Sequence, residues 1–133
     1  MKIICRQRYP TDEQNIVLGY DKGCTVGYEL TVNQQYTVLG INFQNTTLNR
    51  GVIFLLRDDF GRCAFVPICL LDVASPALSK LWIARKFNES DLCLWPEEFF
   101  SEYFHDDLTD GVPAAVAIFE RVCQALVEED ESR

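Results

Sequence analysis

A hairpin signal stands out near the middle of the chain, in the block VIFLLRDDFGRCAFVP at residues 52–67. Two runs of β-type residues, Val52–Arg57 and Arg62–Val66, flank the short segment Asp58-Asp59-Phe60-Gly61. A glycine at the end of a short loop between two such runs is typical of a β-hairpin, because glycine readily adopts the positive φ angle of tight turns. The block therefore favours an antiparallel sheet.

Further β-type runs surround this hairpin. Lys2–Cys5, Tyr36–Phe43 and Leu81–Phe87 are rich in β-branched, aromatic and aliphatic residues, whereas residues 9–15 form a polar connection. We expect five or six strands within residues 1–90. The side chains expected to be buried in the sheet are Val38, Ile41, Phe43, Ile53, Leu55, Phe65 and Val66.

Two helices are expected after the strands. Pro113 suits a first helical turn, and apolar residues recur beyond it at three- and four-residue spacing, which predicts a helix over 113–129 whose Phe119 closes one face of the sheet. The segment WPEEFFSEYFHDD predicts a shorter helix over 96–106. Winding it at about 100° per residue gathers four aromatic residues on an inner face: Phe99, Phe100, Tyr103 and Phe104.

These elements predict an α+β fold in a single domain spanning residues 1–133, since 133 residues suit one domain with one core. Residues 1–90 form its β-rich body, a small and strongly bent antiparallel sheet or barrel, for which an SH3-like arrangement is one option. Residues 91–130 form its acidic helical part, with two C-terminal helices.

Charge is unevenly divided along the chain. Residues 1–90 hold ten Lys/Arg and eight Asp/Glu, a net charge of +2, whereas residues 91–133 hold two Lys/Arg and twelve Asp/Glu, a net charge of −10. An acidic surface repels nucleic acid and steers basic partners towards it. We therefore expect no nucleic-acid binding. The partner-binding carboxylates are expected to be Glu97, Glu98, Glu102, Asp106, Asp107 and Asp110. The alternative is a charged face that only keeps the protein in solution.

The six cysteines lie singly in apolar segments at irregular spacing. The N-terminal sequence MKIICRQRYPTDEQ lacks the apolar core of a signal peptide, and no apolar run reaches the roughly 18 residues of a membrane span. These features predict free, buried thiols in a monomeric cytoplasmic protein that does not enter membranes.

No catalytic or metal-binding pattern is visible. Five residues separate Cys63 from Cys69, and His105 is the only histidine, so a zinc site is not expected. On the predicted helix, His105 falls on the polar face, where we expect a solvated side chain. The carboxylates of Glu98 and Glu102 share that face and are expected to stay ionised. The sequence thus predicts no enzyme, no catalytic residue, no metal and no cofactor.

A small acidic chain with the β-rich stretch YTVLGINF…VIFLLRDDFGRCAFVP and the acidic, aromatic stretch LWPEEFFSEYFHDDL resembles the immunity proteins of bacterial toxin–immunity pairs, including those of contact-dependent growth inhibition. The resemblance extends over the whole chain as a profile and includes no diagnostic motif. It implies that the protein binds and neutralises one cognate toxin domain. Many such toxins are nucleases, whose clefts are basic, and an acidic inhibitor is complementary to such a surface.

Three functions follow as hypotheses. The first is an immunity protein that inhibits its toxin by direct contact. The second is a small cytoplasmic regulatory or ligand-binding domain with a pocket in its barrel. The third is an enzyme that pairs His105 with one of the cysteines.

Overall fold

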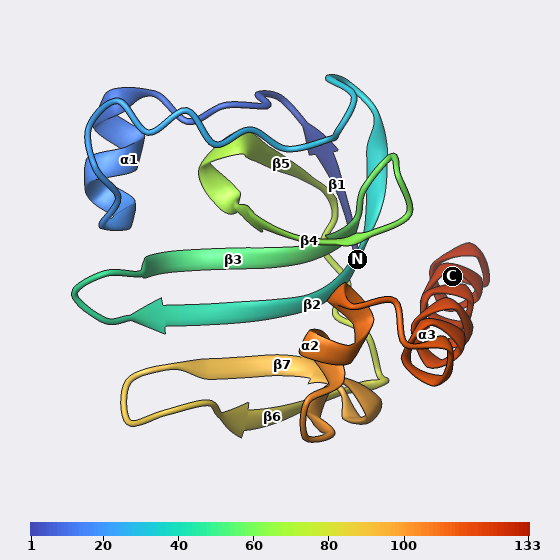
Figure 1. Cartoon of the computed structure of the whole chain (residues 1–133). Helices are drawn as coiled ribbons and strands as arrows, with labels where there is room; N and C mark the ends of the chain where they lie inside the picture. Colours follow the sequence, from blue (N-terminus) through green and yellow to red (C-terminus); the bar gives the residue numbers. More distant parts are fainter.

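The computed structural model describes residues 1–133, in which seven antiparallel strands and three α-helices form an α+β fold (Figure 1). The strands are β1 (Lys2–Cys5), β2 (Gln35–Asn45), β3 (Arg50–Arg57), β4 (Cys63–Pro67), β5 (Leu71–Ser75), β6 (Trp82–Lys86) and β7 (Leu92–Pro96). The helices are α1 (Asp12–Leu18), α2 (Phe104–Thr109) and α3 (Pro113–Glu131), with the 3₁₀ turns η1 (Ile68–Leu70) and η2 (Glu97–Phe100).

The sheet is open and strongly bent around β2. The main order of hydrogen-bonded strands is β4-β3-β2-β1-β5. Strand β7 pairs with the C-terminal half of β2, and β6 pairs with the other edge of β7. Thr37, near the start of β2, pairs with β1, whereas Ile41 pairs with β7. The predicted bent antiparallel sheet is confirmed. It does not close into a barrel, because β4 and β5, the two ends of this order, do not pair.

A β-bulge at Leu39 accounts for part of the bend. Val38 pairs with Leu56 and Gly40 pairs with Leu55, so Leu39 has no partner residue on β3. A bulge adds twist and frees backbone groups from the ladder. The free carbonyl oxygen of Leu39 accepts a hydrogen bond of 2.9 Å from the indole Nε1 of Trp82. This hydrogen bond connects the bulge to β6.

The bend separates two apolar cores. One lies in the fold between β1 and β2–β4 and includes Ile3, Val38, Leu56 and Val66. The other lies between the opposite face of β2, β3 and β7 and the C-terminal segments, and it includes Leu39, Leu55, Phe99, Phe119 and Leu126. In Figure 1, α3 stands at one end of the molecule against the sheet. The acidic third of the chain is thus packed onto the β-rich body by its apolar side chains.

Most of the expected core residues are confirmed as buried: Val38, Ile41, Ile53, Leu55, Val66 and Phe119. The expectation was wrong for Phe43 and Phe65, whose exposed fractions are 39% and 42%. Phe43 lies towards the outer end of β2, beyond the two cores. Phe65 lines the cleft described below.

The expectation of a polar connection over residues 9–15 was wrong, because helix α1 begins at Asp12. Thr11 caps this helix: its hydroxyl accepts from the backbone N–H of Gln14, and the side chain of Gln14 accepts from the N–H of Thr11. This reciprocal arrangement is a capping box, and it stabilises a helix too short to form alone. The strands β5 and β7 were also not expected.

Candidate functional site

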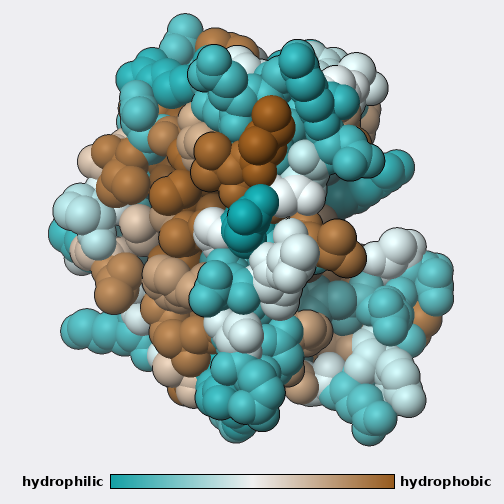
Figure 2. All heavy atoms as spheres, turned by 90° about the vertical axis from the view of Figure 1, so that its left-hand side faces the viewer, coloured by the Kyte–Doolittle hydropathy of each residue, from teal (hydrophilic) through white to brown (hydrophobic).

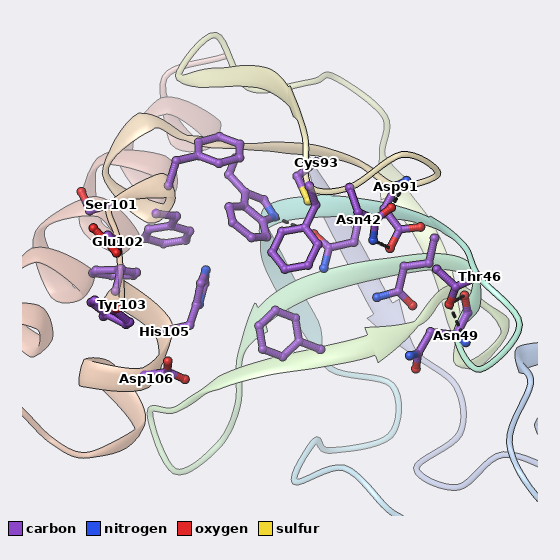
Figure 3. A pocket seen from close by; sticks show the side chains of 18 residues that line it. Asn42, Thr46, Asn49, Asp91, Cys93, Ser101, Glu102, Tyr103, His105 and Asp106 are labelled. Carbon is purple, nitrogen blue, oxygen red and sulfur yellow. Dashed lines mark hydrogen bonds between the residues drawn. The ribbon is translucent and has the colours of Figure 1, made fainter.

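A cleft of about 650 Å³ lies between the sheet and the segment that follows β7 (Figure 3). Strands β2, β4 and β7 supply one side, residues 99–106 supply the other, and the turns after β2 and β6 form the outer end. A volume of this size is within the range of small-ligand and side-chain pockets. This cleft is our candidate functional site.

Trp95 and Asn42 form the floor of the cleft. The indole Nε1 of Trp95, on β7, donates a buried hydrogen bond of 2.6 Å to Oδ1 of Asn42, on β2. This bond fixes the orientation of both side chains, because a buried indole N–H without a partner would be unfavourable. The side-chain amide nitrogen of Asn42 donates no hydrogen bond within the chain, and Figure 3 shows this residue inside the cleft.

Gly40 allows Trp95 to approach the sheet this closely. A Cβ atom at position 40 would lie 2.6 Å from Cδ1 of Trp95 and 3.0 Å from the carbonyl oxygen of Leu94. Both distances are shorter than normal van der Waals contacts, and neither neighbour is free to move, because one is a buried ring and the other is backbone. A glycine is therefore required beneath the indole.

The substitution Gly40→Ala is expected to lower the free energy of unfolding by about 1–3 kcal/mol, because overpacking forces the indole ring out of its site. Urea denaturation measures the loss, and the indole N–H resonance of Trp95 reports the movement. Gln124→Ala is the control, since this side chain is exposed on α3 and lies outside the lining of the cleft. An unshifted Trp95 resonance in Gly40→Ala would contradict the proposed close packing.

The wall opposite the sheet was predicted as a continuous helix over 96–106, and this prediction was wrong. Pro96 ends β7, η2 follows, and Tyr103 adopts a left-handed conformation with φ of 62° before α2 begins at Phe104. In a continuous helix, Phe99 and Phe104 would point about 140° apart. The break at Tyr103 lets both rings enter one core, where they stack with centroids 5.1 Å apart.

The break also changes which aromatic residues are buried. Phe99 and Phe104 are buried, as expected, and Phe100 is partly buried. Tyr103 was expected on the inner face but is 66% exposed at the rim of the cleft. A non-glycine residue at positive φ costs about 1–2 kcal/mol, and such strain is concentrated at functional sites.

His105 was expected to be a solvated surface residue, and this expectation was wrong. Its ring lies among the rings of Phe65, Trp95, Phe99 and Phe104, at centroid distances of 5.6, 4.8, 5.9 and 5.3 Å. The Nε2 atom is buried and has no hydrogen-bond partner. Burial lowers the pKa of His105 below its usual value, and the nearby carboxylate of Asp106 opposes this shift. The imidazole is therefore held neutral.

This depressed pKa predicts how stability depends on pH. As pH falls below about 6.5, the unfolded chain takes up a proton on His105 more readily than the folded chain, so the free energy of unfolding decreases by at most about 1.4 kcal/mol per pH unit. In the variant His105→Phe, the free energy of unfolding is expected to lack this decrease at low pH. Urea denaturation from pH 8 to pH 5 on both proteins measures the difference, and parallel pH profiles would contradict it.

Seven of the 18 residues that line the cleft are aromatic. They come from β4, the β6–β7 turn, β7 and the segment 99–104: Phe65, Phe87, Trp95, Phe99, Phe100, Tyr103 and Phe104. Figure 2 views the end of the molecule with α1 and the hairpin turns, where hydrophobic side chains cover much of the surface. Exposed apolar residues at this end include Ile16, Val17, Leu48 and Phe87. Aromatic and apolar surface of this kind is common at protein interfaces.

The six carboxylates predicted to bind a partner fall into different surroundings. Glu97 lies 3.8 Å from Arg85, and Glu98 lies 3.7 Å from Arg121, so both have a basic neighbour. Glu102 and Asp106 are exposed at the rim of the cleft and form no ion pair or side-chain hydrogen bond. Asp107 and Asp110 lie on and after α2, outside the cleft. The structure thus brings only Glu102 and Asp106 to the site.

Asp91 is a third carboxylate in the cleft, and sequence reasoning missed it. It accepts hydrogen bonds from the backbone N–H of Asn45 at 2.8 Å and from the side chain of Asn88 at 3.0 Å, which joins the turns after β2 and β6. Asn42 and Gln44 were also missed. In the sequence, these two amides alternate with Ile41 and Phe43 along one strand. Because alternate residues of a strand share a face, this pattern indicates that the two amides lie on the same face of the sheet.

Cys93 and His105 line the same cleft, but no hydrogen bond joins them. Burial raises the pKa of the Cys93 thiol to about 11, which opposes formation of a nucleophilic thiolate. All six cysteines are free; three are buried, and Cys69 is exposed, contrary to expectation. No group of three or more His, Cys, Asp or Glu side chains is arranged to hold a metal ion.

No helix is both long enough and apolar enough to cross a membrane. Comparisons of the chain with protein-family models, with curated protein sequences and with solved structures find no match. The residues of the cleft and its rim are therefore the basis for a functional proposal.

Proposed function

We propose that this chain is a non-enzymatic immunity protein that binds a basic toxin domain and neutralises it by direct contact. The observation that supports the proposal best is the cleft itself. It has an aromatic wall, two carboxylates without ionic partners at its rim, Glu102 and Asp106, and no lysine or arginine in its lining. Such a site favours a positively charged protein surface and disfavours phosphate groups.

The surrounding charge supports the same proposal. Residues 91–133 carry a net charge of −10 from twelve Asp/Glu and two Lys/Arg. Both arginines are already engaged, Arg121 with Glu98 at 3.7 Å and Arg133 with Glu129 at 3.3 Å. Residues 91–133 thus contain no cation without an ion pair, and their acidic field would increase the rate of encounter with a basic partner. A nuclease toxin fits this role, because its cleft must attract phosphates.

The proposal includes a monomeric protein acting in the cytoplasm without nucleic acid, metal or cofactor. The raised pKa of Cys93 and the neutral state of His105 give the cleft neither a ready nucleophile nor a thiolate–imidazolium pair. Recognition rather than catalysis is the chemistry that these side chains favour.

The test is a co-expression experiment with the product of the neighbouring gene. We expect a fragment of that gene to stop growth, and this chain to restore growth and to form a complex with the fragment in purified form. A matched control uses the chain with Glu102→Lys and Asp106→Lys, which should fail to rescue. A neighbour that is harmless in every fragment would count against the immunity role.

A second function, a small regulatory or ligand-binding domain, is favoured by one specific observation. The cleft has a volume of about 650 Å³ and is lined by His105, whose Nε2 has no hydrogen-bond partner within the chain. Thermal unfolding in the presence of a set of metabolites tests it. A rise in Tm that depends on His105, with no effect of any neighbouring gene product on growth, would favour this second function.

A further inference from the structure

We propose that the cleft is the insertion site for one arginine side chain of the basic partner, whose guanidinium group lies against the aromatic wall below Glu102 and Asp106. This inference rests on the proposed function and specifies the contact by which the partner is recognised. It assigns to the partner an arginine that is essential for binding.

Charge complementarity points to a cationic occupant. None of the residues that line the cleft is a lysine or arginine, whereas three are carboxylates. Asp91 is engaged in hydrogen bonds with the two neighbouring turns. The carboxylates of Glu102 and Asp106 have no partner within the chain, so both are available to a cation that enters from solution.

The aromatic wall provides the second component of a guanidinium site. A guanidinium group is attracted to the face of an aromatic ring, and the attraction increases where water is excluded. The lining rings most exposed to a cation from solution include Phe65 and Tyr103, whereas the chain's own Arg85 already lies 5.0 Å from the centroid of the Phe100 ring. Phe100 in turn lies 4.7 Å from Trp95, which forms the floor.

The hydrogen-bonding groups favour arginine over lysine. A guanidinium is planar and has five N–H donors in a fixed arrangement, which suits stacking on a ring while bonding to carboxylates at its edge. His105 also lines the cleft, and its neutral ring does not repel a cation. A lysine ammonium is more strongly hydrated and cannot stack in this way.

Nuclear magnetic resonance can test the site without the toxin. His105 is the only histidine and Trp95 is one of two tryptophans, so each gives a resonance that is readily assigned. The probes are the blocked tripeptides Gly-Arg-Gly, Gly-Lys-Gly and Gly-citrulline-Gly, where citrulline keeps the shape of arginine without its charge. Trp82 is the internal control, because its indole is bonded to Leu39 and lies outside the cleft lining.

We expect the arginine peptide to shift the ring resonances of His105 and the indole N–H of Trp95, and to leave Trp82 unchanged. The lysine peptide should bind more weakly, and the citrulline peptide should not bind. The double variant Glu102→Gln/Asp106→Asn should weaken binding of the arginine peptide about five-fold or more, since each exposed charge pair contributes modestly.

Equal shifts with arginine and citrulline, or no shift of His105 and Trp95 at 20 mM peptide, would overturn the inference. That result would leave the immunity role to be judged by the rescue experiment, because a toxin can bind elsewhere on the acidic surface. Conversely, if the arginine peptide binds but no neighbouring gene product is toxic, the cleft is a cation site and the proposed partner is wrong.

Discussion

Phe119→Ala is expected to lower the free energy of unfolding by about 3–5 kcal/mol, the usual loss when a buried phenylalanine is truncated. Phe119 is 2% exposed and stacks on Phe99 at a centroid distance of 6.0 Å, in the core that joins α3 to the sheet. The guanidinium of Arg57 lies 5.8 Å from the centroid of the Phe119 ring.

Urea denaturation followed by circular dichroism measures this loss. Gln124→Ala on the same helix is the control, because Gln124 is exposed and its one side-chain hydrogen bond, to Glu128, is also exposed. Its effect should stay within about 0.5 kcal/mol. A loss below 1 kcal/mol for Phe119→Ala would mean that α3 does not form a core with the sheet.

The β-rich body could be predicted in outline because hairpins and strands leave local patterns. The runs on both sides of Asp58–Gly61 predict β3 and β4 within one or two residues of their observed ends. The bulge at Leu39 is not a local signal, since it depends on which residues of β3 lie opposite Val38 and Gly40. The division of the core into two parts was therefore not predictable from the strand patterns.

The cleft could not be predicted because a helical projection assumes continuous helix. Under that assumption Tyr103 faces inward and His105 faces outward, whereas the left-handed residue at position 103 reverses both positions. The residue type does not indicate a left-handed conformation at position 103, because tyrosine is rarely found at positive φ. The energy that offsets the strain at Tyr103 comes from packing Phe99 and Phe104 into one core, which is a tertiary interaction.

Charge counting predicted the acidic character of the surface but not which carboxylates are available. Glu97 and Glu98 are adjacent to Glu102 in the same acidic stretch, yet Arg85 and Arg121, far away in sequence, approach them in the fold. Such long-range neighbours become visible only once β6 and α3 are placed. Of the six carboxylates, only Glu102 and Asp106 line the cleft, and the proposed interface is therefore centred on them.

The double variant Glu102→Lys/Asp106→Lys is expected to bind the basic partner at least about 100-fold more weakly at low salt, a loss of about 2.7 kcal/mol. Both carboxylates are exposed at the rim of the cleft and lack partners, so reversal places like charges against the partner's surface. The dependence of affinity on salt should also decrease, because salt screens exposed charges. Calorimetric titration at two salt concentrations measures both effects.

The matched control is Glu128→Lys/Glu131→Lys, which changes the net charge by the same amount at exposed positions near the end of α3, outside the lining of the cleft. If the cleft is the interface, this control should lose little affinity, since neither residue lines the cleft and salt screens exposed charges. Equal losses in the two variants would mean that only the overall charge matters. Full affinity in Glu102→Lys/Asp106→Lys would exclude the rim of the cleft from the interface.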